Sequence, residues 1–192
     1  IKQVVDVRDG EIMFGLNMVV HKGKTIFVGD TSVHEYPTSE QMAEIAISTA
    51  RVVRLFGFDP KVAFVSHSTF GQPLTSRTKH IRKAVDILKE KKVDFEFDGD
   101  MQPDVALNPE YEELYPFSKI VGKANILIMP GQHSAAISYK MMKTFGDTKV
   151  IGPLLIGLGL PIEIAPLRSS TSELINLASI AAYSADVIDY KK

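Results

Sequence analysis

Three hydroxyl-rich segments of the chain carry residue types that are suited to hold an anionic ligand. The first, 66–73, reads SHSTFGQP and directly follows an apolar run at 61–65. Hydroxyls, a glycine and backbone N–H groups close to a helix start suit a phosphate group. An ordinary Ser/Thr turn before a solvated basic helix face explains the same residues, and composition alone favours that simpler interpretation. The candidate ligand-binding residues in this part of the chain are Ser66, Ser68, Thr69, Arg77 and Lys79.

The second segment, PGQHS at 130–134, also follows an apolar run and precedes a predicted helix. Gln132 and His133 are both able to donate hydrogen bonds to a phosphate or a carbonyl oxygen. The alternative is a plain N-cap formed by Ser134 or a neighbour. An isolated loop histidine is more often structural or solvent-facing than catalytic. His133 is therefore a candidate for binding and not for catalysis.

The third segment, LRSSTSE at 167–173, places a cation and several hydroxyls in front of a long predicted helix. The macrodipole and the unpaired N–H groups of a helix N-terminus both favour an anion there. These features make Arg168, Ser169 and Ser170 candidates for ligand binding. A capping box beside one surface arginine accounts for the segment equally well.

Asp104, Asn108 and Asp30 are weaker candidates that have simple structural alternatives. Asp104 and Asn108 either hold a ligand hydroxyl or shape the turn before Pro109. Asp30, in the sequence GDT, either pairs with a ligand or caps the end of a strand. The sequence alone leaves both alternatives open.

Composition excludes several classes of site and partner. The 192-residue chain has no cysteine, which excludes disulfides, thiolate metal sites and a cysteine nucleophile. The histidines at 21, 34 and 80 show no metal-ligand spacing, so no metal is expected in this chain. With 22 basic and 23 acidic residues, the net charge of -1 favours neither a nucleic-acid nor a membrane partner. No signal peptide and no uninterrupted apolar span are visible, and we expect a cytoplasmic protein.

Apolar periodicity predicts that strands and helices alternate. Capping boxes at 38–41 and 170–173 mark two helix starts, and glycines at 57 and 146 mark two helix ends. This pattern predicts a three-layer α/β/α fold with a largely parallel sheet, whose strand carboxyl ends hold the ligand. Glycine and proline cluster at 150–161, where a boundary between two subdomains flanking a ligand cleft is expected. Predicted strands are 14–20, 24–28, 61–66, 95–97, 125–129 and 162–164, and predicted helices contain 42–56, 81–88, 137–145 and 172–188.

Five segments, in order, resemble the phosphotransacetylase (phosphate acetyl/butyryl transferase) family. The family's opening segment has no counterpart, so residues 1–192 resemble the carboxyl-terminal portion of such a domain. The start at Ile1, without a methionine, agrees with an incomplete sequence. Residues 66–71 and 134–139 resemble the branch that is fused behind bacterial NADP-dependent malic enzymes. The five segments are GDTSV at 29–33 with PTSEQ at 37–41, VAFVSHSTFG at 62–71, DGDMQPDVALN at 98–108, GKANILIMP at 122–130 and IGPLLIGL at 151–158.

The resemblance implies an acyl-CoA ligand and the loss of acyltransferase activity. Active members carry a Ser-Arg pair and then an Asp at the start of the last helix. Alignment on 175–176 puts Pro166, Leu167 and Glu173 at these positions. A cation lost from the reacting centre weakens transition-state binding more than ground-state binding. The resemblance therefore implies a regulatory domain that binds acetyl-CoA or CoA as an effector and has no catalytic residue.

The same resemblance implies partners for this chain. A malic enzyme domain on the same polypeptide is expected to bind NADP and a divalent metal, and to decarboxylate malate oxidatively to pyruvate under control of acetyl-CoA. A homodimer or higher homo-oligomer is also expected. One alternative is an active phosphate acetyltransferase, which interconverts acetyl-CoA plus phosphate and acetyl phosphate plus CoA, with Arg168 and Ser169 in shifted roles. Another is a dimerisation module that packs through apolar helix faces, including Ala178, Ala181, Ala182 and Ala185.

Overall fold

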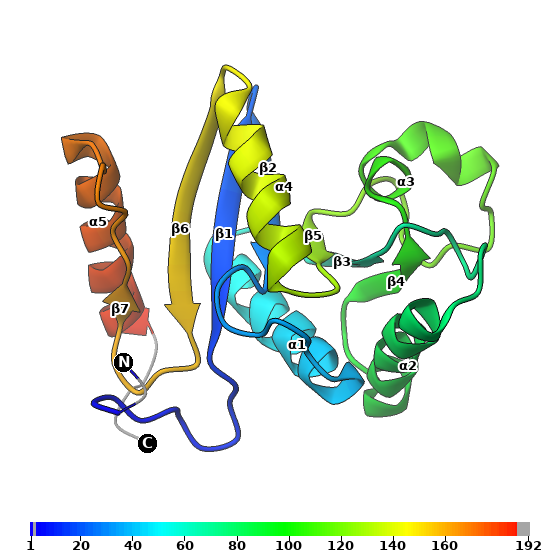
Figure 1. Ribbon diagram of the computed structural model, residues 1–192, viewed down its shortest axis with the longest axis horizontal. Helices are drawn as coiled ribbons and strands as arrows, with labels where there is room; N and C mark the ends of the chain where they lie inside the picture. Colours follow the sequence, from blue (N-terminus) through cyan, green and yellow to red (C-terminus); the bar gives the residue numbers. More distant parts are fainter. Residues whose placement is uncertain (2, 188–192) are drawn as a thin grey trace.

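The computed structural model describes residue 1 and residues 3–187, and in this part of the chain seven strands form one sheet (Figure 1). The strand order is β4-β3-β5-β2-β1-β6-β7. The strands are β1 Phe14–His21, β2 Lys24–Gly29, β3 Lys61–Val65, β4 Glu96–Met101, β5 Ile126–Ile128, β6 Thr148–Ile156 and β7 Ile162–Glu163. The helices are α1 Ser39–Leu55, α2 Ser76–Lys91, α3 Pro103–Leu107, α4 Gln132–Thr144 and α5 Thr171–Val187, with a 3-10 helix at Pro109–Glu113.

The sheet is parallel on one side and antiparallel on the other. β4, β3, β5 and β2 run parallel to one another. After the turn at Lys22 and Gly23, β2 runs antiparallel to β1, and β6 and β7 continue the antiparallel alternation. The predicted α/β fold is confirmed, and its sheet is mixed because the hairpin reverses the chain direction beside β2.

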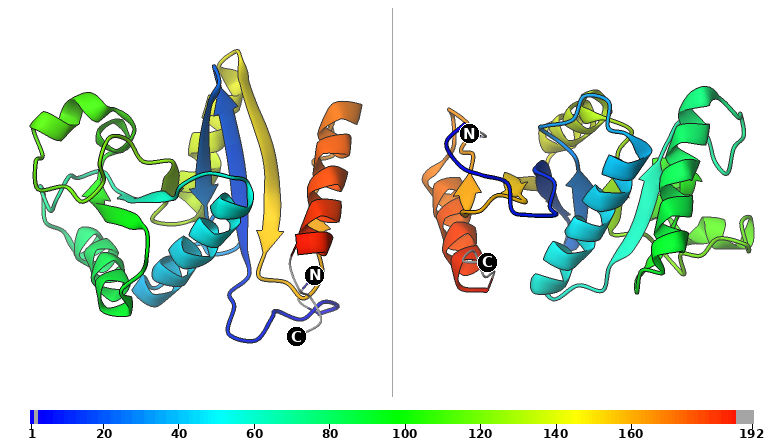
Figure 2. Two further views of the ribbon diagram at one scale, coloured as in Figure 1. Left: turned by 180° about the vertical axis from the view of Figure 1, so that it is seen from behind. Right: turned by 90° about the horizontal axis from the view of Figure 1, so that it is seen from below.

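Helices cover both faces of the sheet, as Figures 1 and 2 show. α1 and α2 pack on the face that carries the buried rings of Phe27 and Phe64. α3 and α4 cover the opposite face through Ala106 and Ala135. Buried residues therefore lie on both sides of the strands, which is the arrangement expected when helices flank a sheet.

Local hydrogen bonds explain where two of the helices begin. At α1, Gln41 N donates to Thr38 Oγ1 over 3.2 Å, and Thr38 N donates to Gln41 Oε1 over 2.8 Å. At α5, Ser170 N donates to Glu173 Oε2 over 2.8 Å, and Glu173 N donates to Ser170 Oγ over 3.3 Å. Both predicted capping boxes are thus confirmed. The predicted end of the last helix, Ile188, lies outside the described residues.

The segment 150–161, where the sequence predicts a subdomain boundary, contains most of β6. This strand pairs with β1 from Thr148 to Ile156 and with β7 on its other side. A Cβ on Gly152 would lie 2.7 Å from the carbonyl oxygen of Leu16, so the close approach of the two strands requires glycine there. β6 thereby connects the α5 edge to the rest of the sheet, while the boundary itself stays a prediction.

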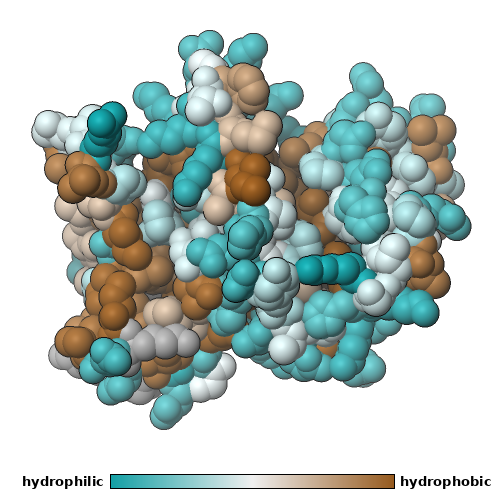
Figure 3. Space-filling model, in the orientation of Figure 1, coloured by the Kyte–Doolittle hydropathy of each residue, from teal (hydrophilic) through white to brown (hydrophobic). Residues whose placement is uncertain are grey.

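The outer face of α5 and β7 is apolar and open. Figure 3 shows apolar side chains gathered on this side of the molecule. Of the four alanines in the dimerisation hypothesis, Ala178, Ala182 and Ala185 are exposed. The expected homo-oligomer stays a prediction. The exposed large apolar residues of this region are Leu160, Ile164, Leu167, Leu174, Ile175, Tyr183 and Val187.

Candidate functional site

A cleft opens at the carboxyl ends of β3 and β5. These neighbouring strands continue into helices on opposite faces of the sheet, β3 into α2 and β5 into α4. In open α/β sheets, such a divergence of connections creates the crevice in which ligands bind. The crevice holds a cavity of about 590 Å³. Its lining comes from residues 35–36, 65–67, 77, 81, 103, 129–131 and 133–134.

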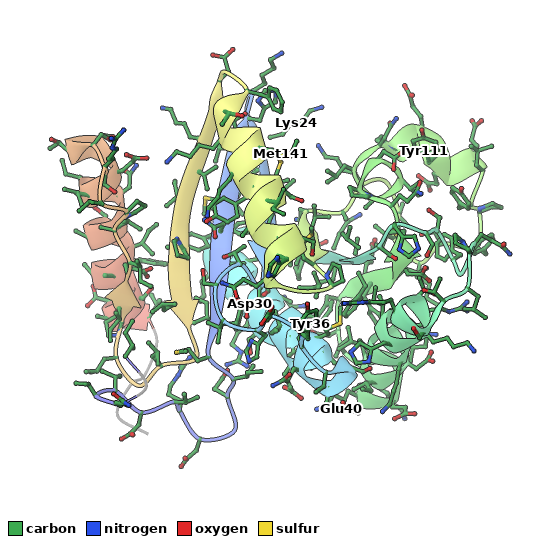
Figure 4. All side chains as sticks on the ribbon, in the orientation of Figure 1. Lys24, Asp30, Tyr36, Glu40, Tyr111 and Met141 are labelled. Atoms are coloured by element: carbon green, nitrogen blue, oxygen red, sulfur yellow. The ribbon has the colours of Figure 1, made fainter. Side chains whose placement is uncertain are left out.

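Arg77, in the first turn of α2, provides the positive charge of the cleft. Its guanidinium carbon lies 5.0 Å from the centroid of the Tyr36 ring, which is a cation–π contact. Figure 4 labels Tyr36 close to the first turn of α4. A neighbouring cavity of about 370 Å³ is lined by the same two side chains. Arg77 therefore borders both cavities, and within the described residues no carboxylate forms an ion pair with it.

The first turn of α4 forms the opposite wall. His133 Nε2 lies 3.4 Å from Glu35 Oε1, and both side chains are exposed in the cleft. The Gln132 amide instead donates to the carbonyl oxygen of Ser32 over 3.3 Å. A side chain on Gly131 would collide with the carbonyl oxygen of Glu35, so glycine allows this contact. His133 thus faces the cavity, whereas Gln132 ties α4 to the loop after β2.

The hydroxyls of the 66–73 segment divide into two groups. Ser66 lines the cavity. Ser68 Oγ donates to the carboxylate of Asp100, and both residues are fully buried. Thr69 Oγ1 accepts a hydrogen bond from Gln102 N over 3.2 Å. Ser68 and Thr69 therefore hold the loop against β4, which keeps Ser66 at the cavity wall.

Asp30 fixes the loop that carries Glu35 and Tyr36. Its carboxylate accepts hydrogen bonds from the backbone N–H groups of Gly15, Ser32, Val33 and His34, over 2.8–3.1 Å, and lies 2.6 Å from His34 Nδ1. Burial raises the pKa of Asp30, but hydrogen bonds from His34, Ser32 and Gly15 outweigh burial and hold the pKa below its ordinary value. The structural alternative for Asp30, a cap at the end of β2, is therefore the arrangement observed.

Three other predicted residues lie outside the lining of the cleft. Lys79 is exposed on α2. Asp104 is exposed in α3, beside Pro103, which does line the cavity. Asn108 Oδ1 accepts a hydrogen bond from Glu110 N over 3.1 Å and caps the 3-10 helix. Asn108 thus shapes a turn, as its structural alternative predicts.

The third predicted segment lies at the far end of α4. Lys143, in the last turn of α4, forms an ion pair with Glu173 at the start of α5, with Nζ and Oε1 3.0 Å apart. Ser169 lines a separate cavity of about 60 Å³ there. The first turn of α4 and Lys143 are about 15 Å apart along the helix axis, at 1.5 Å per residue. The structure thus brings the first two segments together and leaves Arg168, Ser169 and Ser170 at the other end of the helix.

Sequence reasoning missed Glu35 and Tyr36 as residues of the cleft. They follow β2, which lies beside β5 and ends at the same edge of the sheet. The available signal was their position between the end of a predicted strand and the capping box at 38–41. The path of the loop that carries Glu35 and Tyr36 depends on Asp30. One of the backbone groups that donate to Asp30 belongs to Gly15, which is 15 residues away in the sequence.

The described residues form neither a membrane-spanning helix nor a cluster of metal ligands. No helix in this part of the chain is both long and apolar enough to cross a membrane. No group of three or more histidine, aspartate or glutamate side chains there is arranged to hold a metal ion. The side chains that line the cleft include a cation, hydroxyls, two histidines, a carboxylate, an aromatic ring and apolar groups.

Known proteins that resemble the chain fall into two groups. It is 45% identical over 185 residues to an NADP-dependent malic enzyme of Rhizobium meliloti (strain 1021), covering 96% of this chain and 24% of that protein. It is 31% identical over 185 residues to a phosphate acetyltransferase of Bacillus subtilis (strain 168), covering 95% of this chain and 57% of that protein. A solved phosphotransacetylase from Streptococcus pyogenes matches with a TM-score of 0.89 and 30% identity, over 96% of this chain and 57% of that chain.

The family resemblance expected from the five sequence segments is confirmed. The chain spans about a quarter of the malic enzymes that it matches and little more than half of the phosphotransacetylases. Residues 1–182 match the family described as phosphate acetyl/butaryl transferase. The fold, the sequence match and the superposition agree: the chain belongs to the phosphate acetyl/butaryl transferase family.

Proposed function

We propose that the chain is an acyl-CoA-binding regulatory domain of an NADP-dependent malic enzyme, with acetyl-CoA or CoA as its effector. The observation that carries the proposal is the cleft between α2 and α4, where Arg77 stands beside the Tyr36 ring with no carboxylate partner among the described residues. The malic enzyme domain on the same polypeptide would bind NADP and a divalent metal and convert malate to pyruvate. The 45% identity to a malic enzyme supports this assignment.

The chemistry of the cleft suits the parts of an acyl-CoA molecule. Arg77 matches a phosphate or pyrophosphate group, for which a guanidinium provides a planar set of donors. The N-terminal end of α4 adds a partial positive charge, and Gln132 N already donates to the carbonyl oxygen of His34 over 3.0 Å. The Tyr36 ring offers a surface on which an adenine can stack. Val65, Ile81 and Met129 supply an apolar wall for the thioester end.

Among the residues that the structure describes, Ser66 of the cleft has no hydrogen-bond partner that would activate it as a nucleophile. Ser66 Oγ lies 3.4 Å from Ser68 Oγ, and no histidine or carboxylate of the described residues hydrogen-bonds to it. An unactivated serine hydroxyl is a weak nucleophile. At the start of α5, Glu173 is engaged by Ser170 and Lys143. These contacts support a domain that binds its ligand without cleaving it.

A second candidate function is an active phosphate acetyltransferase. The 31% identity to the Bacillus subtilis enzyme favours it, and Arg168 is exposed at the start of α5. In the structure Arg168 lies at the opposite end of α4 from the cleft. Acetyl transfer with Arg168 at the reacting centre would therefore require Arg168 to lie closer to the cleft. CoA-dependent formation of acetyl phosphate, measured on the full-length natural protein, separates the two functions.

Titration calorimetry with acetyl-CoA tests the binding site. Arg77→Ala is expected to weaken binding at least tenfold, because the phosphate groups lose their cation. Arg54→Ala is the matched control, since Arg54 is exposed, pairs with Asp94 and is absent from the lining of the cleft. Absence of measurable binding to the natural protein, or equal affinities for the two variants, would overturn the assignment.

Regulation is tested by malate-dependent NADPH formation in the full-length natural protein. Acetyl-CoA is expected to change this rate, and Arg77→Ala to raise the half-effective acetyl-CoA concentration at least tenfold. A ligand acts on the second domain only if it binds one arrangement of the domains more tightly than the other. If acetyl-CoA binds while the rate stays constant, the domain binds acyl-CoA without regulating the enzyme.

A further inference from the structure

A second cavity lies at the opposite end of the parallel strands from the cleft. Its volume is about 380 Å³, which is within the range of small-molecule sites. β2 begins at Lys24 on one wall, and Lys123 and Ala124 precede β5 on another. The end of α4 closes the third side. The cavity shares no lining residue with the cleft, so its occupant would not compete with acyl-CoA for the same side chains.

The walls of this cavity are mainly apolar. Val19 and Ala124 are buried, whereas Phe145 is 65% exposed at the rim. Figure 4 shows Lys24 near Met141 of α4, at the end of the β1–β2 hairpin. An apolar ligand gains from leaving water against such walls. The six apolar side chains that line the cavity are Val19, Ile26, Leu107, Ala124, Met142 and Phe145.

The ionisable side chains that line the cavity are all of basic type. Lys24, Lys123 and His21 are present, and no aspartate or glutamate occurs among the described lining residues. Neither lysine forms an ion pair within the part of the chain that the structure describes. His21 Nδ1 shares a hydrogen bond of 2.8 Å with Thr148 Oγ1. The C-terminal end of α4 adds a partial negative charge, which is about half an elementary charge and smaller than that of the two ammonium groups.

We propose that this cavity binds a small amphipathic anion, namely a medium-chain carboxylate. The hydrocarbon chain would lie against the apolar walls, and the carboxylate would face Lys24 and Lys123. An uncharged molecule of the same length would leave the two ammonium groups without a partner. A cationic one would meet them with like charge. The anionic head group of the ligand therefore supplies the selectivity, and its hydrocarbon chain supplies the contact area.

Titration calorimetry of the full-length natural protein with octanoate tests this proposal. Octanoate is expected to bind saturably, and at least tenfold more tightly than octan-1-ol or octylammonium. The double variant Lys24→Glu/Lys123→Glu is expected to weaken octanoate binding at least tenfold. Lys22→Glu/Lys92→Glu changes the net charge by the same amount outside the cavity and is expected to bind like the natural protein. Arg77→Ala, which alters the cleft alone, is expected to leave octanoate affinity unchanged.

Three outcomes would overturn the proposal. One is absence of saturable octanoate binding. Another is equal affinity for octanoate and octan-1-ol, which would show an apolar surface without recognition of charge. The last is a dimer in sedimentation that Lys24→Glu/Lys123→Glu dissociates while octanoate fails to bind, which would make this face an interface between copies of the chain.

Discussion

The guanidinium of Arg77 lies over the ring of Tyr36, 5.0 Å from its centroid, and joins α2 to the loop after β2 across the cleft. Arg77 comes from the helix that follows β3, and Tyr36 follows β2. Two segments that are 41 positions apart in the sequence thus meet at one edge of the sheet. The pairing holds the cation of the cleft in place while leaving its N–H donors available.

Tyr36→Ala is expected to weaken acetyl-CoA binding roughly five- to tenfold, because the ring both orients Arg77 and offers a stacking surface. Tyr36 is 65% exposed, so the free energy of unfolding should change by less than about 1 kcal/mol. Titration calorimetry and urea unfolding measure the two effects. Tyr36→Phe keeps the ring and should bind like the natural protein. An equal loss in the phenylalanine variant would assign the effect to the hydroxyl instead.

Asp30→Asn is expected to lower the free energy of unfolding at pH 7 by about 3 kcal/mol, because an amide cannot accept all the hydrogen bonds that the carboxylate accepts. The folded pKa lies below the ordinary 3.8, so the carboxylate's contribution is present above about that pH. It is lost as the pH falls through the lower folded pKa. Urea unfolding at pH 7, 4 and 2.5 should therefore show the two proteins converging only at the lowest pH, which lies well below 3.8. The exposed Asp59→Asn serves as control, and a constant difference at all three pH values would contradict this account.

Glu163→Gln is expected to stabilise the chain increasingly from pH 5 to pH 8.5. Burial raises the pKa of Glu163 from 4.5 to about 8, against a smaller opposing effect of the Leu155 backbone. The folded state therefore binds the proton more tightly than the unfolded state, and stability falls as the pH rises from about 4.5 through about 8. Glutamine stays neutral at every pH. Thermal unfolding at pH 5, 7 and 8.5 measures the difference in Tm, and a pH-independent difference would show that Glu163 does not titrate in this way.

Ser68→Ala is expected to cost about 1–3 kcal/mol of stability, since it leaves the buried carboxylate of Asp100 without its hydroxyl donor. Acetyl-CoA affinity should fall only as far as the 66–73 loop loses order, because Ser68 lies behind the wall of the cleft. Urea unfolding and calorimetry on the same sample separate the two effects. Ser179→Ala, at an exposed position of α5, is the matched control. A large loss of affinity at unchanged stability would place Ser68 in contact with the ligand.

Much of the fold follows from local patterns in the sequence. Most strands and helices were predictable because apolar periodicity and capping boxes, such as that of Thr38 and Gln41, are local signals. β6 and α3 were not predicted, because glycine and proline interrupt the pattern of β6 and α3 is only five residues long. The mixed sheet was less accessible, since the pairing of β6 with β1 joins residues more than a hundred positions apart. Periodicity cannot specify which strands become neighbours.

The sequence predicted only part of the candidate site, because two of the three predicted segments line the cleft and the third does not. Ser66 and His133 line the same cavity because they follow β3 and β5, which are neighbours in the sheet. Arg168 does not join them, because β6 and β7 carry the chain to the other edge before α5 begins. The clustering of hydroxyls at helix starts therefore indicated anion-binding chemistry at each segment, but not which segments share a cavity.

The two ends of helix α4 contact different parts of the molecule. His133 at one tip borders the cleft, and Lys143 at the other is ionically bonded to Glu173 of α5. An α-helix bends far less readily than a loop, so a ligand that tilts the first turn also displaces the second tip. Ligand binding in the cleft would then shift the contact between Lys143 and Glu173 without any rearrangement of the strands between them.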